Sequence, residues 1–68
     1  MYLINVREGD YIRAGMRFKG PQKFFKVTLI EWVSETTIRV HTEGGIYDGP
    51  AYSEPGVSRV VNGKHVRY

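Results

Sequence analysis

The sequence contains no cysteine and no long apolar run, and each absence excludes a class of protein. Without cysteine, neither a disulfide nor a thiolate-bound metal can stabilise the fold, so a reducing location such as the cytoplasm is expected. The apolar stretch over residues 27–33 is interrupted by Thr28 and Glu31 and is far shorter than the roughly 20 residues that cross a bilayer. The first residues also lack the basic and apolar regions of a signal peptide. We therefore expect no contact with a membrane.

Residue types that carry catalysis are sparse as well. The two histidines, His41 and His65, fall in different predicted hairpins. A nucleophilic triad needs a histidine between a nucleophile and a carboxylate, and a zinc site needs three or four suitably spaced ligands. Gly44-Gly45 is followed by neither a lysine nor a helix, so it does not match a phosphate-binding P-loop. We expect a protein that is not an enzyme and that uses no metal or cofactor.

Patterns typical of helices are missing, whereas patterns typical of strands recur along the chain. No window of about a dozen residues keeps apolar side chains at helical spacing. Instead, β-branched and aromatic residues alternate with polar ones between turns rich in glycine and proline. A chain of 68 residues is long enough for one domain. We expect residues 1–68 to form a single all-β domain, a small barrel of five or six short antiparallel strands with a C-terminal hairpin.

The alternation predicts strands over residues 2–7, 11–18, 23–33, 36–41, 58–61 and 64–68. In the first of these, Ile4 and Val6 share one face. The apolar phase of the third strand changes after Leu29, which indicates a β-bulge. Residues 42–57 hold four glycines and two prolines, so we expect an irregular segment with at most a short strand at Ile46-Tyr47. The predicted core consists of Ile12, Met16, Phe25, Val27, Leu29, Ile38 and Val40.

The dipeptide Asn62-Gly63 between two β-rich segments predicts a tight hairpin, because both residues tolerate positive φ. A two-residue loop would pair Val61 with Lys64, and a three-residue loop would pair Val61 with His65. We favour the three-residue loop because it separates apolar from polar residues better. If the outer edge of this hairpin has no partner strand, it could pair with the sheet of another copy of the protein, which makes a homodimer possible.

The stretch Arg7-Glu8-Gly9-Asp10-Tyr11-Ile12-Arg13 resembles the opening of many SH3-like barrels, including the KOW and Tudor-like groups, in which a Gly-Asp turn precedes the first barrel strand. A loop, a long bent strand, a short turn and a partner strand follow in the same order, so the resemblance extends over residues 7–61. It implies an SH3-like barrel. Barrels of this kind bind RNA, DNA, peptides and other proteins, so the resemblance does not choose a ligand.

The formal net charge of +3 is unevenly distributed. Residues 1–26 and 55–68 are basic, whereas residues 27–54 carry five acidic residues and one arginine. Basic side chains at period 2 form a row about 7 Å apart on one face of a sheet, which suits successive phosphates, and aromatic rings among them can stack on bases. The pattern predicts weak, largely sequence-independent nucleic-acid binding through Tyr11, Arg13, Arg17, Lys19, Lys23, Phe24, Lys26, Arg59, Lys64 and Arg67.

Two other interpretations account for the same residues. A row of basic side chains also keeps an edge strand soluble and prevents aggregation. Alternatively, the protein binds or inhibits a partner protein, as many small single-domain β-proteins of phages and mobile elements do. Its anchors would then be exposed aromatic residues, which dominate binding energy in interfaces, although a core this small also needs its aromatics. The candidate anchors are Trp32, Tyr47, Tyr52 and Tyr68.

Overall fold

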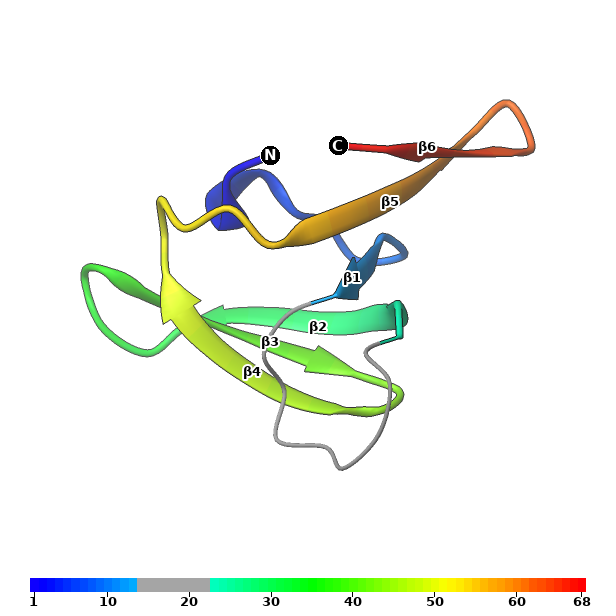
Figure 1. Cartoon of the computed structure of the whole chain (residues 1–68). Coiled ribbons are helices and arrows are strands. Elements are labelled where there is room, and N and C mark those ends of the chain that lie inside the picture. The colour runs from blue at the N-terminus through cyan, green and yellow to red at the C-terminus, as the bar shows by residue number, and fades with distance from the viewer. Residues whose placement is uncertain (14–22) are drawn as a thin grey trace.

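The computed structural model describes residues 1–13 and 23–68 and confirms an all-β fold. Within this part of the chain, six antiparallel strands form one sheet in the order β4-β3-β2-β1-β5-β6 (Figure 1). The strands are β1 (Tyr11–Arg13), β2 (Phe25–Trp32), β3 (Thr37–Thr42), β4 (Gly45–Pro50), β5 (Gly56–Val61) and β6 (Lys64–Arg67). That the sheet is an SH3-like barrel stays a prediction. No helix in the described residues has the length and apolar character needed to cross a membrane.

A β-bulge in β2 determines which side chains reach the core. The register between β2 and β3 shifts between Val27 and Leu29, which confirms the predicted bulge. Val27 is buried and Ile30 packs against the core, but Leu29 is 46% exposed on the opposite face. The prediction that Leu29 belongs to the core was therefore wrong, because the phase of the strand changes before this residue and not after it.

The hydrophobic core lies between the two halves of the bent sheet. Ile12, Val27, Ile38 and Val40 are buried, as predicted. Phe25 is only half-buried, and Met16 lies outside the described residues. The other core residues come from the segments that cover the sheet and from β5: Leu3, Val6, Ala51 and Val57.

The predicted strand over residues 2–7 is instead a single 3-10 turn, η1 (Leu3–Asn5). The backbone N–H of Leu3 donates to the carbonyl of Ser53, and that of Ile4 donates to the carbonyl of Ala51. These bonds hold the turn against the connection between β4 and β5. The expectation that Ile4 shares a face with Val6 was wrong, because the turn buries Leu3 and Val6 and exposes Ile4.

The expectation of irregular structure over residues 42–57 was wrong for β4, which pairs with β3 along its whole length. Gly49 lies where a Cβ atom would be 2.6 Å from the hydroxyl of Tyr47, so this glycine makes room for the ring rather than for a turn. Pro50 is compatible with β4 because the strand is at the edge of the sheet. In β4, Gly49 therefore makes room for a packed ring and Pro50 occupies an edge strand.

The last hairpin has the two-residue loop and not the favoured three-residue loop. Val61 pairs with Lys64, and the loop residues Asn62 and Gly63 have φ of 51° and 77°. Two successive residues with positive φ are typical of the tight type I′ turn, whose twist matches that of the strands. All of β6 is exposed. The end of the hairpin therefore has no buried face, so placing apolar and polar residues on separate faces did not decide its register. The geometry of the turn decided it.

Candidate nucleic-acid interface

Strands β2, β1, β5 and β6 share one outer face. Tyr11 pairs with Lys26 on one side and with Ser58 on the other, and Ser58 pairs with Arg67. Paired residues of antiparallel strands point to the same side of a sheet. Because the neighbouring Ile12 points into the core, these four side chains form a row across the outer face.

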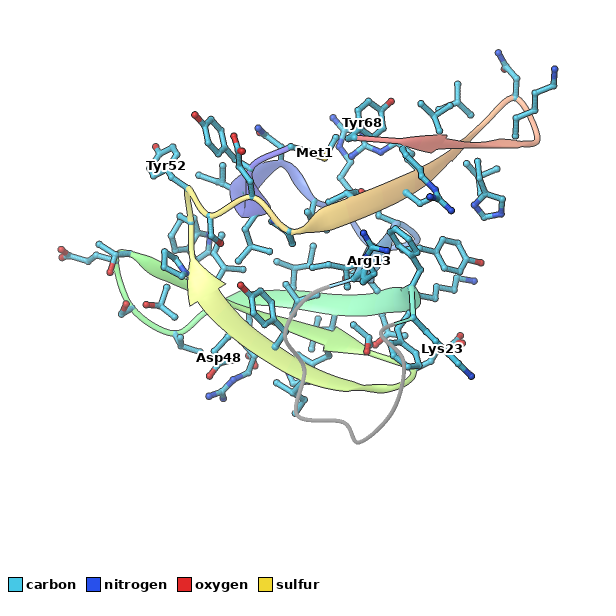
Figure 2. All side chains as sticks on the ribbon, viewed as in Figure 1. Met1, Arg13, Lys23, Asp48, Tyr52 and Tyr68 are labelled. Atoms are coloured by element: carbon cyan, nitrogen blue, oxygen red, sulfur yellow. The ribbon has the colours of Figure 1, made fainter. Side chains whose placement is uncertain are left out.

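Phe24 brings two arginines together beside this row. The guanidinium carbon of Arg13 lies 5.1 Å from the centre of the Phe24 ring, and that of Arg67 lies 5.4 Å from it. Both distances allow cation–π attraction. Arg13, which is labelled in Figure 2, pairs with Gly56 of β5, and a Cβ atom on that glycine would lie 3.6 Å from Arg13 Nε, so the Arg13 side chain lies close against this residue.

His65 completes the arrangement from β6. Its ring meets that of Tyr11 edge-on, with 5.3 Å between the ring centres. Its Nδ1 atom lies 3.3 Å from the hydroxyl oxygen of Ser58, at hydrogen-bond distance. We call the resulting surface the cationic face and define it as Tyr11, Arg13, Phe24, Lys26, His65 and Arg67.

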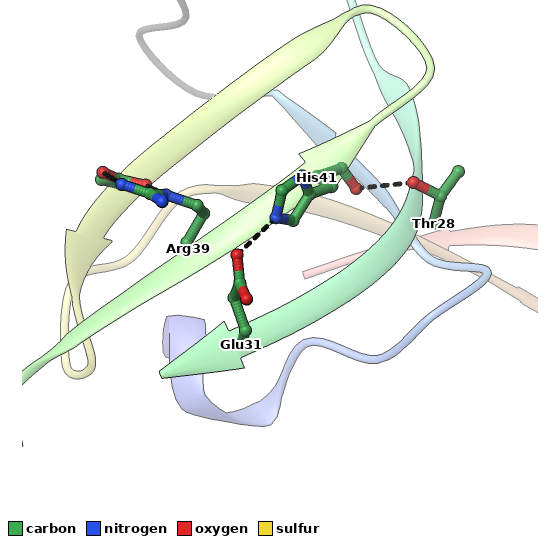
Figure 3. A network of polar contacts seen from close by, with 5 residues as sticks. Thr28, Glu31, Arg39 and His41 are labelled. Carbon is green, nitrogen blue, oxygen red and sulfur yellow. Dashed lines mark hydrogen bonds and ion pairs between the residues drawn. The ribbon is translucent and has the colours of Figure 1, made fainter. Parts of the chain in front are cut away.

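The basic side chains of the cationic face have no acidic partner among the described residues. On the outer face of β2, β3 and β4, by contrast, the acidic side chains contact basic or imidazole groups (Figure 3). Arg39 Nε and Nη2 donate to the two carboxylate oxygens of Asp48 at 2.8 and 2.9 Å, and His41 Nε2 lies 2.7 Å from Glu31 Oε1. The hydrogen bond with Arg39 lowers the pKa of Asp48. Three cations without an acidic partner in the described part of the chain, Arg13, Lys26 and Arg67, therefore lie together on the cationic face.

Arg59, a predicted binding residue, lies on the core side of the sheet instead. Its Nε and Nη2 atoms donate to the two oxygens of Asp10, each at 2.9 Å, and Nη2 also donates to the carbonyl of Asn5 at 3.1 Å. Burial alone would raise the pKa of Asp10, but hydrogen bonds from Arg59 and from the backbone of Arg7, together with their charges, lower it. Arg59 thus holds the start of β1 to β5 and the N-terminal turn.

Five of the ten predicted residues meet in the cationic face: Tyr11, Arg13, Phe24, Lys26 and Arg67. Lys23 is exposed and precedes Phe24 in the chain. Lys64 pairs with Val61 and therefore points to the other side of the hairpin. Arg17 and Lys19 lie outside the described residues. Within the described residues, no three acidic or histidine side chains are close enough to hold a metal ion.

His65 was not predicted as a site residue, although one signal in the sequence identifies it. The Asn-Gly dipeptide is the preferred loop of a two-residue hairpin. Counting outward from that loop pairs Val60 with His65 and Ser58 with Arg67, as the structure does. The longer loop shifts the pairing by one residue, and that shift hides the alignment of His65 with the arginines.

No protein-family model, no curated protein and no solved structure matches this chain. The class of ligand has to be inferred from the chemistry of the cationic face. Guanidinium and ammonium groups donate hydrogen bonds and accept none, so they suit phosphate and carboxylate oxygens.

Proposed function

We propose that the protein is a small, non-catalytic binding module that contacts the phosphate backbone of nucleic acid through the cationic face. The observation that carries the proposal is the division of charge over the outer surface. Arg13, Lys26 and Arg67 lie on one half without acidic partners among the described residues, whereas on the other half Arg39 forms an ion pair with Asp48 and His41 contacts Glu31. A sheet whose basic side chains only kept it soluble would not need its paired and unpaired charges on separate halves.

Binding of this kind draws its free energy from counterion release. Each phosphate that a basic side chain neutralises contributes a slope of about −0.7 for a single strand, or −0.9 for a duplex, to the dependence of log affinity on log salt. Three cations therefore predict a slope of about −2 to −3. None of the contacts reads a base edge, so affinity should depend little on sequence.

The aromatic rings favour a single strand over a duplex. Tyr11 and Phe24 lie among the cations on the same face. Unpaired bases can stack on such rings, and each stacked base contributes about 1–3 kcal/mol, whereas paired bases inside a duplex are not available. We expect oligothymidylate to bind more tightly than a duplex of the same length at the same salt concentration.

The test compares two double variants with the same net charge. Arg13→Ala/Arg67→Ala removes two cations from the cationic face, and Arg39→Ala/Lys64→Ala removes two from elsewhere. Fluorescence anisotropy with labelled oligothymidylate over a range of salt concentrations gives the slope for each. We expect the first variant to lose about 1.4 from the slope and the second to lose almost nothing. Equal losses would show that net charge and not the face governs binding, and absence of binding at low salt would refute the proposal.

A further inference from the structure

The β6 strand leaves a row of main-chain groups without strand partners in the described part of the chain. Around the two-residue loop, the main-chain groups of Lys64 and Val66 bond to β5, as residues of a hydrogen-bonded pair do. The N–H of Tyr68 continues this alternation by donating to the carbonyl of Val57 at 2.8 Å. The residues whose N–H and C=O groups point away from β5 are His65 and Arg67.

The opposite edge of the sheet is protected where β6 is not. On β4, the residues with outward main-chain groups are Ile46, Asp48 and Pro50, because Ala51 donates to the carbonyl of Thr36 and fixes the alternation. Proline has no N–H, so this edge loses a donor. β6 contains neither a proline nor a bulge, and Figure 1 shows it as the outermost strand, at the C-terminal end of the chain.

Charge decides which strand can pair with this edge. Residues 55–68 contain no acidic residue. Two β6 strands placed antiparallel around Val66 would bring the Lys64 and Arg67 cations of both copies into one pair of strands with no acidic residue to balance them, which disfavours that pairing. An added strand with acidic residues opposite His65 and Arg67 would be attracted instead. The side chains on the other face, where Val66 is 38% exposed, would meet the alternate residues of that strand.

We propose that the open edge of β6 binds an extended segment of a partner protein in which acidic and apolar residues alternate. Main-chain hydrogen bonds to His65 and Arg67 would extend the sheet by one strand. Acidic side chains would lie beside His65 and Arg67, and apolar side chains would cover Val66. This site goes beyond the nucleic-acid interface, because a phosphate backbone offers acceptors only, whereas the edge presents alternating donors and acceptors.

The probe is a short capped peptide that alternates glutamate and valine, titrated into isotope-labelled protein and followed by NMR. A peptide of the same composition with its glutamates in one block is the control. We expect saturable binding of the alternating peptide, with slower hydrogen exchange at the amides of His65 and Arg67. Equal binding of the two peptides would overturn the proposal, since composition would then suffice. Concentration-dependent dimerisation of the free protein would also overturn it, because the edge would pair with itself.

A matched pair of variants separates the main chain from the side chain. Arg67→Ala and Arg67→Pro both remove the charge, and both leave the hydrogen bonds from β6 to β5 in place. Only the proline variant also removes the N–H that points away from β5. We expect the proline variant to bind the peptide about tenfold more weakly than the alanine variant. Equal affinities would refute strand addition. Both variants should bind oligothymidylate with equal affinity. A loss of peptide affinity in the proline variant alone would then not come from a change in the nucleic-acid interface.

Discussion

The ion pair between Asp10 and Arg59 gives the sharpest stability prediction. Asp10 is 3% exposed, and its carboxylate accepts two hydrogen bonds from Arg59 and one from the N–H of Arg7. Arg59→Ala would leave this charge buried without its partner. Breaking a buried pair in this way costs about 3–5 kcal/mol, and the lower end applies because the Arg59 side chain is 23% exposed.

A loss of about 3 kcal/mol is a large part of the total, which for a domain of this size is about 3–10 kcal/mol. The double variant Asp10→Asn/Arg59→Met removes both charges and should cost less than the sum of the single variants Asp10→Asn and Arg59→Met. Urea denaturation followed by circular dichroism gives all four free energies of unfolding. Additive single effects would mean that the two side chains are not coupled, which would refute the role assigned to the pair.

The same pair predicts how stability depends on pH. The pKa of Asp10 in the fold is lower than the ordinary value of 3.8. Its contribution is therefore complete above that value and is lost as pH falls through the lowered pKa of the folded state. The difference in unfolding free energy between the parent and Asp10→Asn should be constant near neutral pH and should shrink in strong acid. A difference that grows below pH 4 would contradict this assignment.

Three further changes test the packing. Ile38→Ala should cost about 2–5 kcal/mol in urea denaturation because Ile38 is 1% exposed, whereas Leu29→Ala should cost well under 2 kcal/mol because Leu29 lies on the outer face. If the two changes cost the same, the bulge is misplaced. Gly63→Val should lower the melting temperature and disorder the last hairpin, because a β-branched residue is strained at a φ of 77°. Unchanged melting would exclude this turn.

Sequence periodicity predicted the parts of the fold that have one buried and one exposed face. Ile12, Ile38 and Val40 alternate with polar residues, and all three are buried. Alternation failed where the chain departs from regular pairing. At Leu29 a bulge reverses the phase, and at residues 2–7 an apolar stretch that fits a strand forms a turn. Hydrogen bonds to residues 51–53 select that turn, and a local pattern does not contain them.

The candidate site was predictable in composition but only partly in arrangement. Period 2 placed Arg13 and Tyr11 outward, next to Ile12, which points inward. Pairing across four strands, which no local pattern specifies, brought Arg67 from the last hairpin to Phe24. The same long-range contacts turned Arg59 toward Asp10, because a buried carboxylate needs a partner.

The measurement that tests the central claim most directly is an NMR titration of labelled protein with oligothymidylate at low salt. We predict that chemical-shift changes concentrate on the cationic face, in the backbone amides of Tyr11, Arg13 and Arg67 and in the ring of Phe24. The amides of β3 and β4 around Arg39 should stay unchanged, and added salt should reverse the shifts. Shifts centred on β3 and β4, or no shifts at saturating oligonucleotide, would contradict the assignment of the interface.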